Sequence, residues 1–178
     1  ARRAAAELRI PLEIADIRQA LFQQVVQPFV EGYLQGVTPI PCVLCNPAVK
    51  FRFLLDYADR IGAAYAATGH YARLRHTEAG YVGLFASPAF NDQSYMLYRL
   101  SQSQLNRLVF PLGKLAGKDD TRTLARRYGL SAAHKPDSME ICFVPDGDYA
   151  RFIGEQAGPR TPPPGDFVDQ AGNVLGRH

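Results

Sequence analysis

The sequence has few cysteines and no long apolar run, and both features narrow the class of protein. Three cysteines among 178 residues are too few, and an odd number, for the disulfide framework of a secreted domain. No stretch approaches the roughly 18 apolar residues of a membrane-spanning helix. The opening residues, ARRAAAELRI, lack the apolar segment of a secretory signal peptide. We therefore expect a cytoplasmic protein with no membrane partner.

Composition and charge are those of an ordinary folded domain. The chain is 47% hydrophobic and 21% charged, which is typical of globular proteins. Its formal net charge of +3 permits an anionic partner such as RNA or a nucleotide without requiring one. The chain opens on a helical pattern without an initiating methionine and closes directly after a strand-like pattern. We expect both ends to be cut from a longer protein.

The first part of the chain mixes helical and strand patterns. Residues 1–8 have the pattern of a helix, and LEIADI at 12–17 predicts a strand because its apolar residues alternate. Residues 21–34 have helical spacing, and Pro28 should bend or divide that helix.

A helix followed by a buried strand gives the fold class. Pro47 suits the first turn of a helix with Asn46 as its N-cap, and Gly62 should end that helix. Residues 63–68 are small and apolar enough for a buried strand, which ends at Thr68-Gly69-His70. This order predicts a parallel sheet in an α/β protein, with ligands beyond the carboxyl end of the strand.

The rest of the chain carries shorter patterns and a stiff linker. The proline-rich TPPPG stretch at 161–165 suggests an α/β domain over 1–160 and the beginning of a β-rich domain over 161–178. The other expected elements are a hairpin at 71–74 and 81–85, a short helix at 93–100, a capping box at Ser101 and Gln104, a basic helix at 118–128 ended by Gly129, a short apolar segment at 140–144, a helix at 148–156 and a hairpin at 166–175.

Two of the three cysteines share one short motif, TPIPCVLCN, which we expect to form a proline-stiffened loop. A zinc site would need a second C-x-x-C or a histidine pair, and the sequence has neither. Three interpretations of this motif remain open. Cys42 and Cys45 could form a redox dithiol, they could be two small apolar residues without a chemical role, or a loop cysteine could act as a nucleophile together with the distant Cys142. Cys45 precedes the expected helix, whose amide dipoles would lower the pKa of its thiol. Cys142 lies in an Ile-Cys-Phe-Val run that equally fits a core strand.

Several motifs in one order carry a family resemblance. They are TPIPCVLCN, ATGHYAR, NDQSYMLY, FPLGKL, DSMEICFVPDGDYARFI and PGDFVDQAGNVLGRH, and together they resemble the tRNA-specific 2-thiouridylases over nearly the whole chain. The resemblance implies a Rossmann-like parallel sheet of the ATP-pyrophosphatase (adenine nucleotide alpha hydrolase-like) type, followed by a small β-rich domain. The pyrophosphate loop and C-terminal barrel of that family are not found in the sequence. We therefore expect no ATP turnover from these 178 residues alone.

The resemblance also implies an activity, ATP-dependent 2-thiolation of the wobble uridine of tRNA. ATP with Mg²⁺ would adenylate the C2 oxygen of the uridine, and a cysteine persulfide would supply the sulfur. By resemblance, Cys142 carries the persulfide and Cys45 is the nucleophile, and the cycle ends in a Cys45–Cys142 disulfide. The implied partners are tRNA and a sulfur-donor protein.

Further site residues follow from matching positions. Gly69 matches a glycine that contacts ATP, where the missing side chain lets the nucleotide approach the backbone. Many relatives have aspartate in place of Cys42, and a thiol is a much weaker acid, so no acid–base role is transferred to it. The positions matched to the target base are Ile40, Pro41 and Cys42, and those matched to tRNA are His70, Asn91, Asp92 and Gln93.

Two of these expectations have structural alternatives. Asp92 and Gln93 could instead form a turn or be buried. A basic face on the expected helix at 118–128 could touch the tRNA backbone or be an ordinary solvated surface; it comprises Lys118, Arg122, Arg126 and Arg127. Two other function classes remain open for the whole chain, a C-x-x-C dithiol redox protein and a non-catalytic RNA-binding module.

Overall fold

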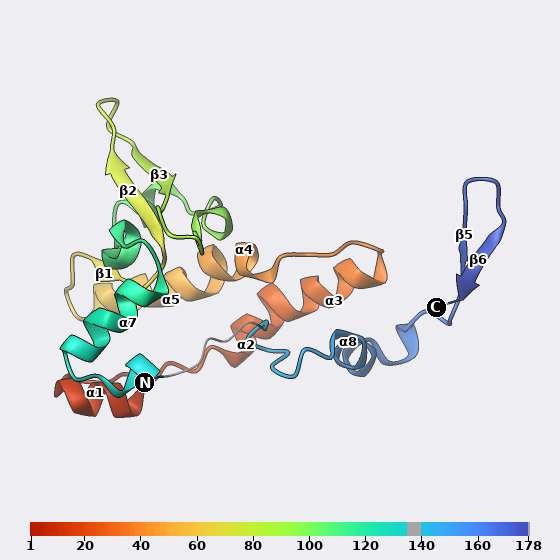
Figure 1. Cartoon of the computed structure of the whole chain (residues 1–178), viewed down its shortest axis with the longest axis horizontal. Helices are drawn as coiled ribbons and strands as arrows, with labels where there is room; N and C mark the ends of the chain where they lie inside the picture. The colour runs from red at the N-terminus through yellow and green to blue at the C-terminus, as the bar shows by residue number, and fades with distance from the viewer. Residues whose placement is uncertain (135–139, 178) are drawn as a thin grey trace. The chain divides into compact units, whose positions relative to one another are not determined.

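The computed structural model describes residues 1–134 and 140–177. These residues belong to two compact units, drawn in Figure 1. The first unit is Ala1–Pro28 with Ile40–Asp137, and the second is Phe29–Pro39 with Ser138–His178. The domain boundary expected near residue 160 stays a prediction. No helix within the described ranges is long and apolar enough to span a bilayer.

The N-terminal helices confirm two predictions. Helix α1 covers Arg2–Leu8. Helix α2, Arg18–Leu21, runs through the π-helical turn η1, Phe22–Val26, into α3, Gln27–Leu34. The helical stretch thus continues through Pro28, and the π-helical turn lies just before it. Proline has no amide hydrogen and its ring crowds the preceding turn, so a widened turn next to it relieves the clash.

The strand expected at residues 12–17 is wrong. These residues have no regular secondary structure, and Leu12 and Ile14 are 42% and 59% exposed. A strand needs a neighbour to take up its backbone hydrogen bonds. Each strand in the described ranges pairs with another one, in the sheets β1–β4, β2–β3 and β5–β6. An alternating pattern without an available neighbour therefore stays irregular.

The helix that follows begins earlier than the sequence indicates. Helix α4, Pro41–Cys45, continues through the π-helical turn η2, Asn46–Lys50, into α5, Phe51–Arg60. Proline is favoured at the first helical position because its fixed φ suits the helix and its missing amide hydrogen is not needed there. The prediction of Asn46 as N-cap is wrong, whereas Gly62, at φ +72°, ends the helix as expected.

The strands of the first unit confirm the α/β class. Strand β1, Ala66–Ala67, pairs in parallel with β4, Leu108–Val109. The Ala66 amide donates to the Arg107 carbonyl at 2.8 Å. The predicted hairpin is formed by β2, Ala72–His76, and β3, Val82–Ala86, which pair antiparallel.

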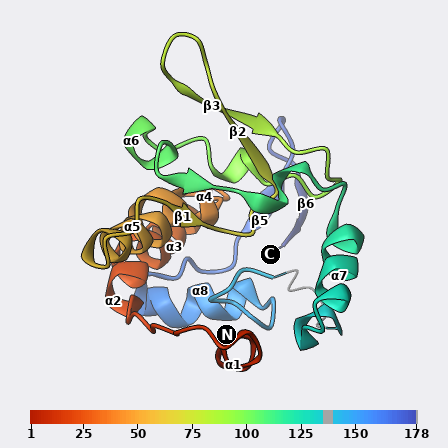
Figure 2. The same ribbon diagram turned by 90° about the vertical axis from the view of Figure 1, so that its left-hand side faces the viewer.

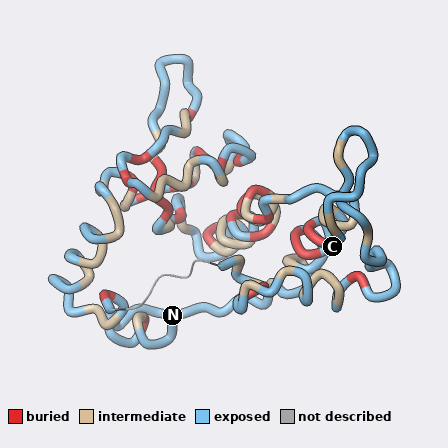
Figure 3. The backbone as a smooth tube through the Cα atoms, turned by 45° about the vertical axis from the view of Figure 1, so that its right-hand side comes forward, coloured by how far each residue is buried: buried red, intermediate tan, exposed pale blue. Residues whose placement is uncertain are grey.

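The core of the first unit lies where α5, β1 and the hairpin meet. Figure 2 shows α5 beside β1, and Figure 3 colours the chain by the burial of each residue. Phe51 and Leu97 are fully buried there. The core cluster is Phe51, Ala66, Ala72, Val82, Leu97, Leu100, Leu105, Leu108 and Phe110.

The remaining elements of the first unit are short. The helix expected at 93–100 is only the 3₁₀ turn η3, Ser94–Met96. Helix α6, Gln102–Leu105, has the predicted capping box. The other elements are the 3₁₀ turn η4, Pro111–Lys114, the helix α7, Lys118–Arg127, which Gly129 follows at φ +64°, and the 3₁₀ turn η5, Ser131–His134.

The second unit has an aromatic core and a separate hairpin. Helix α8, Tyr149–Ala157, begins at Asp148, whose carboxylate accepts the Arg151 amide at 2.9 Å. The 3₁₀ turn η6, Gly158–Arg160, precedes the predicted hairpin of β5, Asp166–Val168, and β6, Val174–Arg177. The ring of Phe143 packs against those of Phe29 and Phe152, with centroids 5.3 and 5.6 Å away.

Candidate functional site

Both cysteines of the C-x-x-C motif lie in the first turns of a helix. Ile40 is the extended N-cap of α4, Pro41 is its first residue, and Cys42 and Cys45 are half-buried. The expected proline-stiffened loop is therefore wrong, and Cys45 lies one turn inside the helix. The dipole argument for its thiol, which placed Cys45 before a helix start, no longer holds.

Asn46 anchors this helix through its buried side chain, a role that its position in the sequence did not reveal. The side chain is completely buried, and its Nδ2 donates to the Met96 carbonyl at 2.9 Å. Gln104 adds a second tie, from Nε2 to the Pro47 carbonyl at 3.0 Å. Oδ1 of Asn46 has no hydrogen-bond partner among the described residues. Buried polar groups are nearly always hydrogen-bonded, because losing a partner costs free energy. These two bonds therefore hold the cysteine-bearing helix against η3 and α6.

Gly69 lies just past the carboxyl end of β1, where the parallel sheet predicted a ligand site. The residue is exposed. A Cβ built on it would meet only the Leu112 Cδ1 atom, at an ordinary contact distance of 3.4 Å. Packing within the described chain therefore does not require glycine here. An open backbone at the end of a parallel strand is suited to close approach by a ligand.

His70, the next residue, is buried and neutral. It is 8% exposed, and its ring lies 5.5 and 5.8 Å from those of Phe51 and Phe110 between centroids. The Thr68 hydroxyl and the His70 Nδ1 atom are hydrogen-bonded at 2.8 Å. Burial first, and then the charge of Lys50, lower the pKa of His70 to about 4. At neutral pH the ring therefore carries no positive charge.

This depressed pKa predicts a pH-dependent stability. The pKa of an unfolded histidine is about 6.5, so between pH 6.5 and 4 the unfolded state binds more protons than the folded state. Stability should therefore fall as the pH is lowered through that window, and His70→Asn should lose less of it. Thermal unfolding of both proteins from pH 7 to 4 measures the difference. Parallel losses in the two proteins would contradict the burial of a neutral His70.

The segment 91–93, which is predicted to contact tRNA, lies in a turn held by its own side chains. The Asp92 carboxylate accepts the Ser87 amide at 2.7 Å and the Ser94 hydroxyl at 2.6 Å. Gln93 Oε1 accepts the Tyr71 amide at 3.0 Å. These bonds favour the turn-forming alternative for Asp92 and Gln93.

The two residues before Asp92 differ from it. Asn91 makes no side-chain hydrogen bond to the described part of the chain and is half-buried. Phe90 next to it is fully exposed, and no sequence motif indicates a role for it. Of the three contacts predicted in this segment, Asn91 is thus the one whose side chain makes no hydrogen bond within the described turn.

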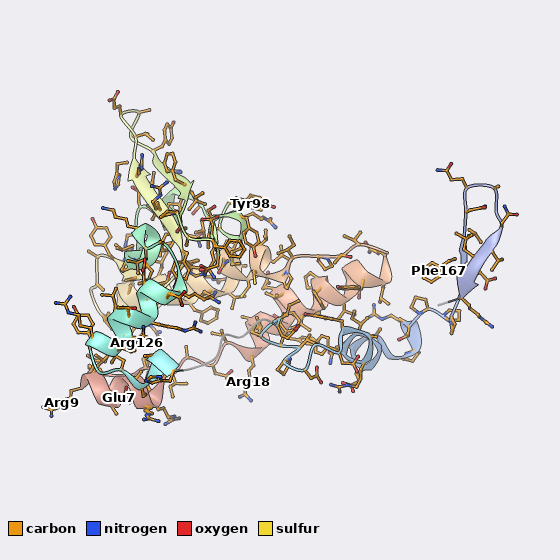
Figure 4. All side chains as sticks on the ribbon, in the orientation of Figure 1. Glu7, Arg9, Arg18, Tyr98, Arg126 and Phe167 are labelled. Carbon is orange, nitrogen blue, oxygen red and sulfur yellow. The ribbon has the colours of Figure 1, made fainter. Side chains whose placement is uncertain are left out.

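The basic helix α7 also carries acids and internal contacts. Its first turn contains Asp119 and Asp120, and Arg122 lies 3.8 Å from the Asp119 carboxylate. Arg126, labelled in Figure 4, donates to the Thr123 hydroxyl at 3.0 Å. These partners offset part of the positive charge and favour the solvated-surface alternative for this face.

Cys142 lies in a turn and is exposed, so the core-strand interpretation is wrong. The Val144 amide donates to the Ile141 carbonyl at 2.9 Å, which closes the turn. Val144 is 1% exposed and Phe143 packs between two aromatic rings, so the two following side chains anchor the segment. The start of the DSMEICFVPDGDY motif, at residues 137–139, lies outside the described residues. The structure has each of the three cysteines as a thiol, and the predicted disulfide stays a prediction.

Comparison with known proteins decides the family. The profile of the tRNA methyl transferase HUP domain matches residues 1–146. The chain belongs to this family. HUP domains are α/β and Rossmann-like, which agrees with the parallel pair of β1 and β4.

Curated relatives of this HUP-domain chain confirm the resemblance drawn from its motifs. The "tRNA-specific 2-thiouridylase MnmA" of Syntrophotalea carbinolica is 49% identical over the whole chain, and that of Paracoccus denitrificans is 48% identical. "MnmA 2" of Syntrophus aciditrophicus is 44% identical. The alignments cover 50%, 46% and 52% of these proteins. The chain thus spans about half the length of the relatives it matches.

No cluster that could hold a metal ion by itself is present in the described ranges. They contain no group of three or more histidine, cysteine, aspartate or glutamate side chains placed for one. The first unit contributes two half-buried thiols, an open glycine, a neutral histidine and an ordered polar turn, and the second unit contributes the exposed thiol of Cys142.

Proposed function

We propose that the full-length protein containing this chain is an ATP-dependent tRNA-uridine 2-sulfurtransferase that thiolates the wobble uridine. The observation that carries the proposal is 44–49% identity over the entire chain to proteins named tRNA-specific 2-thiouridylases. Two structural features support the proposal. Cys142 is exposed in a turn, and Cys45 is half-buried in a helix that the Asn46 side chain anchors.

Activation of the uridine calls for a nucleotide. The C2 carbonyl is a poor electrophile and its oxygen a poor leaving group. ATP, when bound with Mg²⁺, supplies an adenylyl group that turns this oxygen into part of AMP, a good leaving group. In this chain Gly69 would give the nucleotide access to the backbone, because only the Leu112 Cδ1 atom borders the space where its side chain would be.

The two cysteines divide the sulfur transfer. Cys142 would carry a persulfide, and its outer sulfur would bond to C2 as the C2–O bond to AMP breaks. The Cys45 thiolate would then attack the Cys142 Sγ atom and break the S–S bond to the new sulfur. The transferred sulfur gains two electrons and leaves as the 2-thio group, and the two cysteines lose two electrons and form a disulfide. Cys142 is exposed, as the loading of a persulfide by a donor protein requires.

The other residues would bind the tRNA. Ile40, which is 55% exposed, together with Pro41 and Cys42 at the start of α4, would line the target base through shape and backbone. His70 and Asn91 would contact the tRNA, while Asp92 and Gln93 shape the turn that presents Asn91. Because His70 is neutral, its contact would not be a charge pair with phosphate.

Incubation of the full-length protein with ATP, Mg²⁺, a sulfur donor and unmodified tRNA tests the proposal. We expect 2-thiouridine in the digested tRNA by nucleoside mass spectrometry, and none when ATP is omitted. Product formation without ATP, or its absence from the complete reaction, would refute the proposal. The matched control is a tRNA whose wobble position is not uridine.

One observation favours a second candidate, a dithiol redox protein. Cys42 and Cys45 are three residues apart in one helix, and residues at this spacing are neighbours on a helix surface. This candidate needs no ATP and no tRNA, and gives Cys142 no role. The pair of cysteines that becomes oxidised distinguishes the two candidates.

A further inference from the structure

We propose that a basic cavity beside the β2–β3 hairpin binds phosphate groups of an RNA backbone; the choice of RNA rests on the proposed function. The cavity has a volume of about 560 Å³ and lies within the first unit. Strand β2, strand β4 and the turn η4 form most of its wall. The lining residues that matter are Tyr65, Arg73, Arg75, His76, Phe110 and Lys114.

The charge of this cavity is of one sign. Arg73, Arg75 and Lys114 line it, together with His76, and no aspartate or glutamate is among its lining residues. A concave surface with several like charges concentrates the electrostatic potential and attracts ions of the opposite sign. The cavity is therefore suited to an anion.

The three cations are not neutralised within the described part of the chain. None of them is in an ion pair there. Arg73 Nε donates to the Ala86 carbonyl at 2.7 Å, which fixes the side chain and leaves its two terminal nitrogens for a ligand. The Arg75 guanidinium lies 5.2 Å from the centroid of the Phe85 ring, a contact that orients it without cancelling its charge.

Two other cations of the first unit have acidic partners. Arg107 pairs with the Asp59 carboxylate at 2.8 Å, and Arg122 on α7 lies near Asp119. The cavity thus gathers three cations with no acidic partner among the described residues. An RNA backbone supplies the missing negative charge, and arginine forks match phosphate oxygens in geometry.

Close packing brings the cations together from two segments. The backbone of η4 lies so close to β2 that a Cβ on Gly113 would fall 1.9 Å from the Ala72 carbonyl oxygen and 3.4 Å from the Arg73 Cγ atom. Lys114 follows Gly113 directly, so its backbone is held beside the stem of Arg73. Fixed backbone positions reduce the entropy lost when these side chains bind an anion.

An exposed aromatic ring favours RNA over a free phosphate. Tyr65 lines the cavity and is 64% exposed. Aromatic rings beside a basic groove provide stacking surfaces for unpaired bases. Inorganic phosphate would use only the charges, whereas RNA would use both the charges and the ring.

Binding of an unmodified tRNA transcript to the full-length protein tests this cavity. The double variant Arg75→Ala/Lys114→Ala removes two cations from it. The control Arg52→Ala/Arg60→Ala removes two exposed cations from α5, one of which, Arg60, also lies over a tyrosine ring. Near 0.1 M salt, the cavity variant should bind about tenfold or more weakly, and its slope of log affinity against log salt should fall by about 1.4.

A charge-preserving variant separates charge from folding. Arg75→Lys/Lys114→Arg should bind tRNA like the wild type, and inorganic phosphate should compete only weakly for the cavity. Equal affinity and equal salt slope for the cavity variant and the α5 control would overturn the inference, as would loss of binding in the charge-preserving variant. A wild type that binds no tRNA would overturn it too.

A parallel thiolation assay keeps this inference apart from the proposed function. Formation of 2-thiouridine with no selective effect of the cavity variant on binding would refute the cavity alone. A selective loss of tRNA binding in the cavity variant, with no 2-thiouridine from the wild type, would refute the proposed function alone.

Discussion

Replacing Cys45 or Cys142 by serine in the full-length protein is expected to abolish 2-thiouridine formation, with a loss of at least ~10³-fold, as for other catalytic nucleophiles. A serine hydroxyl can neither carry a persulfide nor attack one at neutral pH. Cys42→Ser is the matched control, because the proposal gives the Cys42 thiol no chemical step. It should retain most of the activity.

The three serine variants are compared by initial rates of 2-thiouridine formation at saturating tRNA. Cys142 is exposed, so Cys142→Ser should not alter stability. Unfolding curves of each variant separate chemical loss from misfolding. If Cys42→Ser is as inactive as Cys45→Ser while Cys142→Ser is active, the relay between Cys45 and Cys142 is contradicted.

Gly113→Ala is expected to cost about 3 kcal/mol of the free energy of unfolding. The added Cβ would lie 1.9 Å from the Ala72 carbonyl oxygen and 2.9 Å from its carbon, and both atoms belong to the backbone. A backbone carbonyl in strand β2 cannot rotate away as a flexible side chain can. Either η4 or β2 must move, and Gly113 is buried between them.

Gly154→Ala is the matched control for this substitution. Gly154 lies inside α8, and a Cβ on it would meet no atom within 4 Å. Alanine is favoured over glycine inside helices, so this variant should gain about 0.5–1 kcal/mol. Chemical denaturation of the full-length protein measures both variants. A Gly113→Ala protein as stable as the wild type would contradict the close contact of η4 with β2.

Local signals predicted the fold best where they act within a few residues. Gly62 and Gly129 end their helices at positive φ, and the capping box of Ser101 opens α6. The two hairpins and strand β1 also form where the sequence predicts strands. Each of these features depends on neighbours in sequence or on a strand within the same unit.

The helix of the C-x-x-C motif could not be located from its prolines. Pro41 and Pro47 suggested a loop and a later helix start, but Pro41 begins the helix and Pro47 lies within a π-helical turn. A widened turn accepts an internal proline at low cost, and no local pattern announces it. The strand pattern at 12–17 failed for another reason, because a strand depends on a partner elsewhere.

The site residues likewise divide into those whose roles follow from nearby sequence and those whose roles depend on distant contacts. The turn role of Asp92 and Gln93 was one of two stated alternatives, and it is visible in their hydrogen bonds. The burial of His70 depends on Phe51 and Phe110, which are distant in sequence, so its low pKa could not be predicted. Asn46 became an anchor only because η3 packs against the helix in which it lies. The roles of Cys45, Cys142 and Gly69 come from family resemblance and stay proposals.

Mapping the disulfide left after a single turnover tests the sulfur relay most directly. The full-length protein, loaded with persulfide, is mixed with ATP and tRNA in the absence of reductant, then alkylated, digested and analysed by mass spectrometry. We expect a peptide pair joined through Cys45 and Cys142, in an amount equal to the 2-thiouridine formed. A Cys42–Cys45 disulfide, or thiolated tRNA with every cysteine still alkylated as a thiol, would contradict the relay.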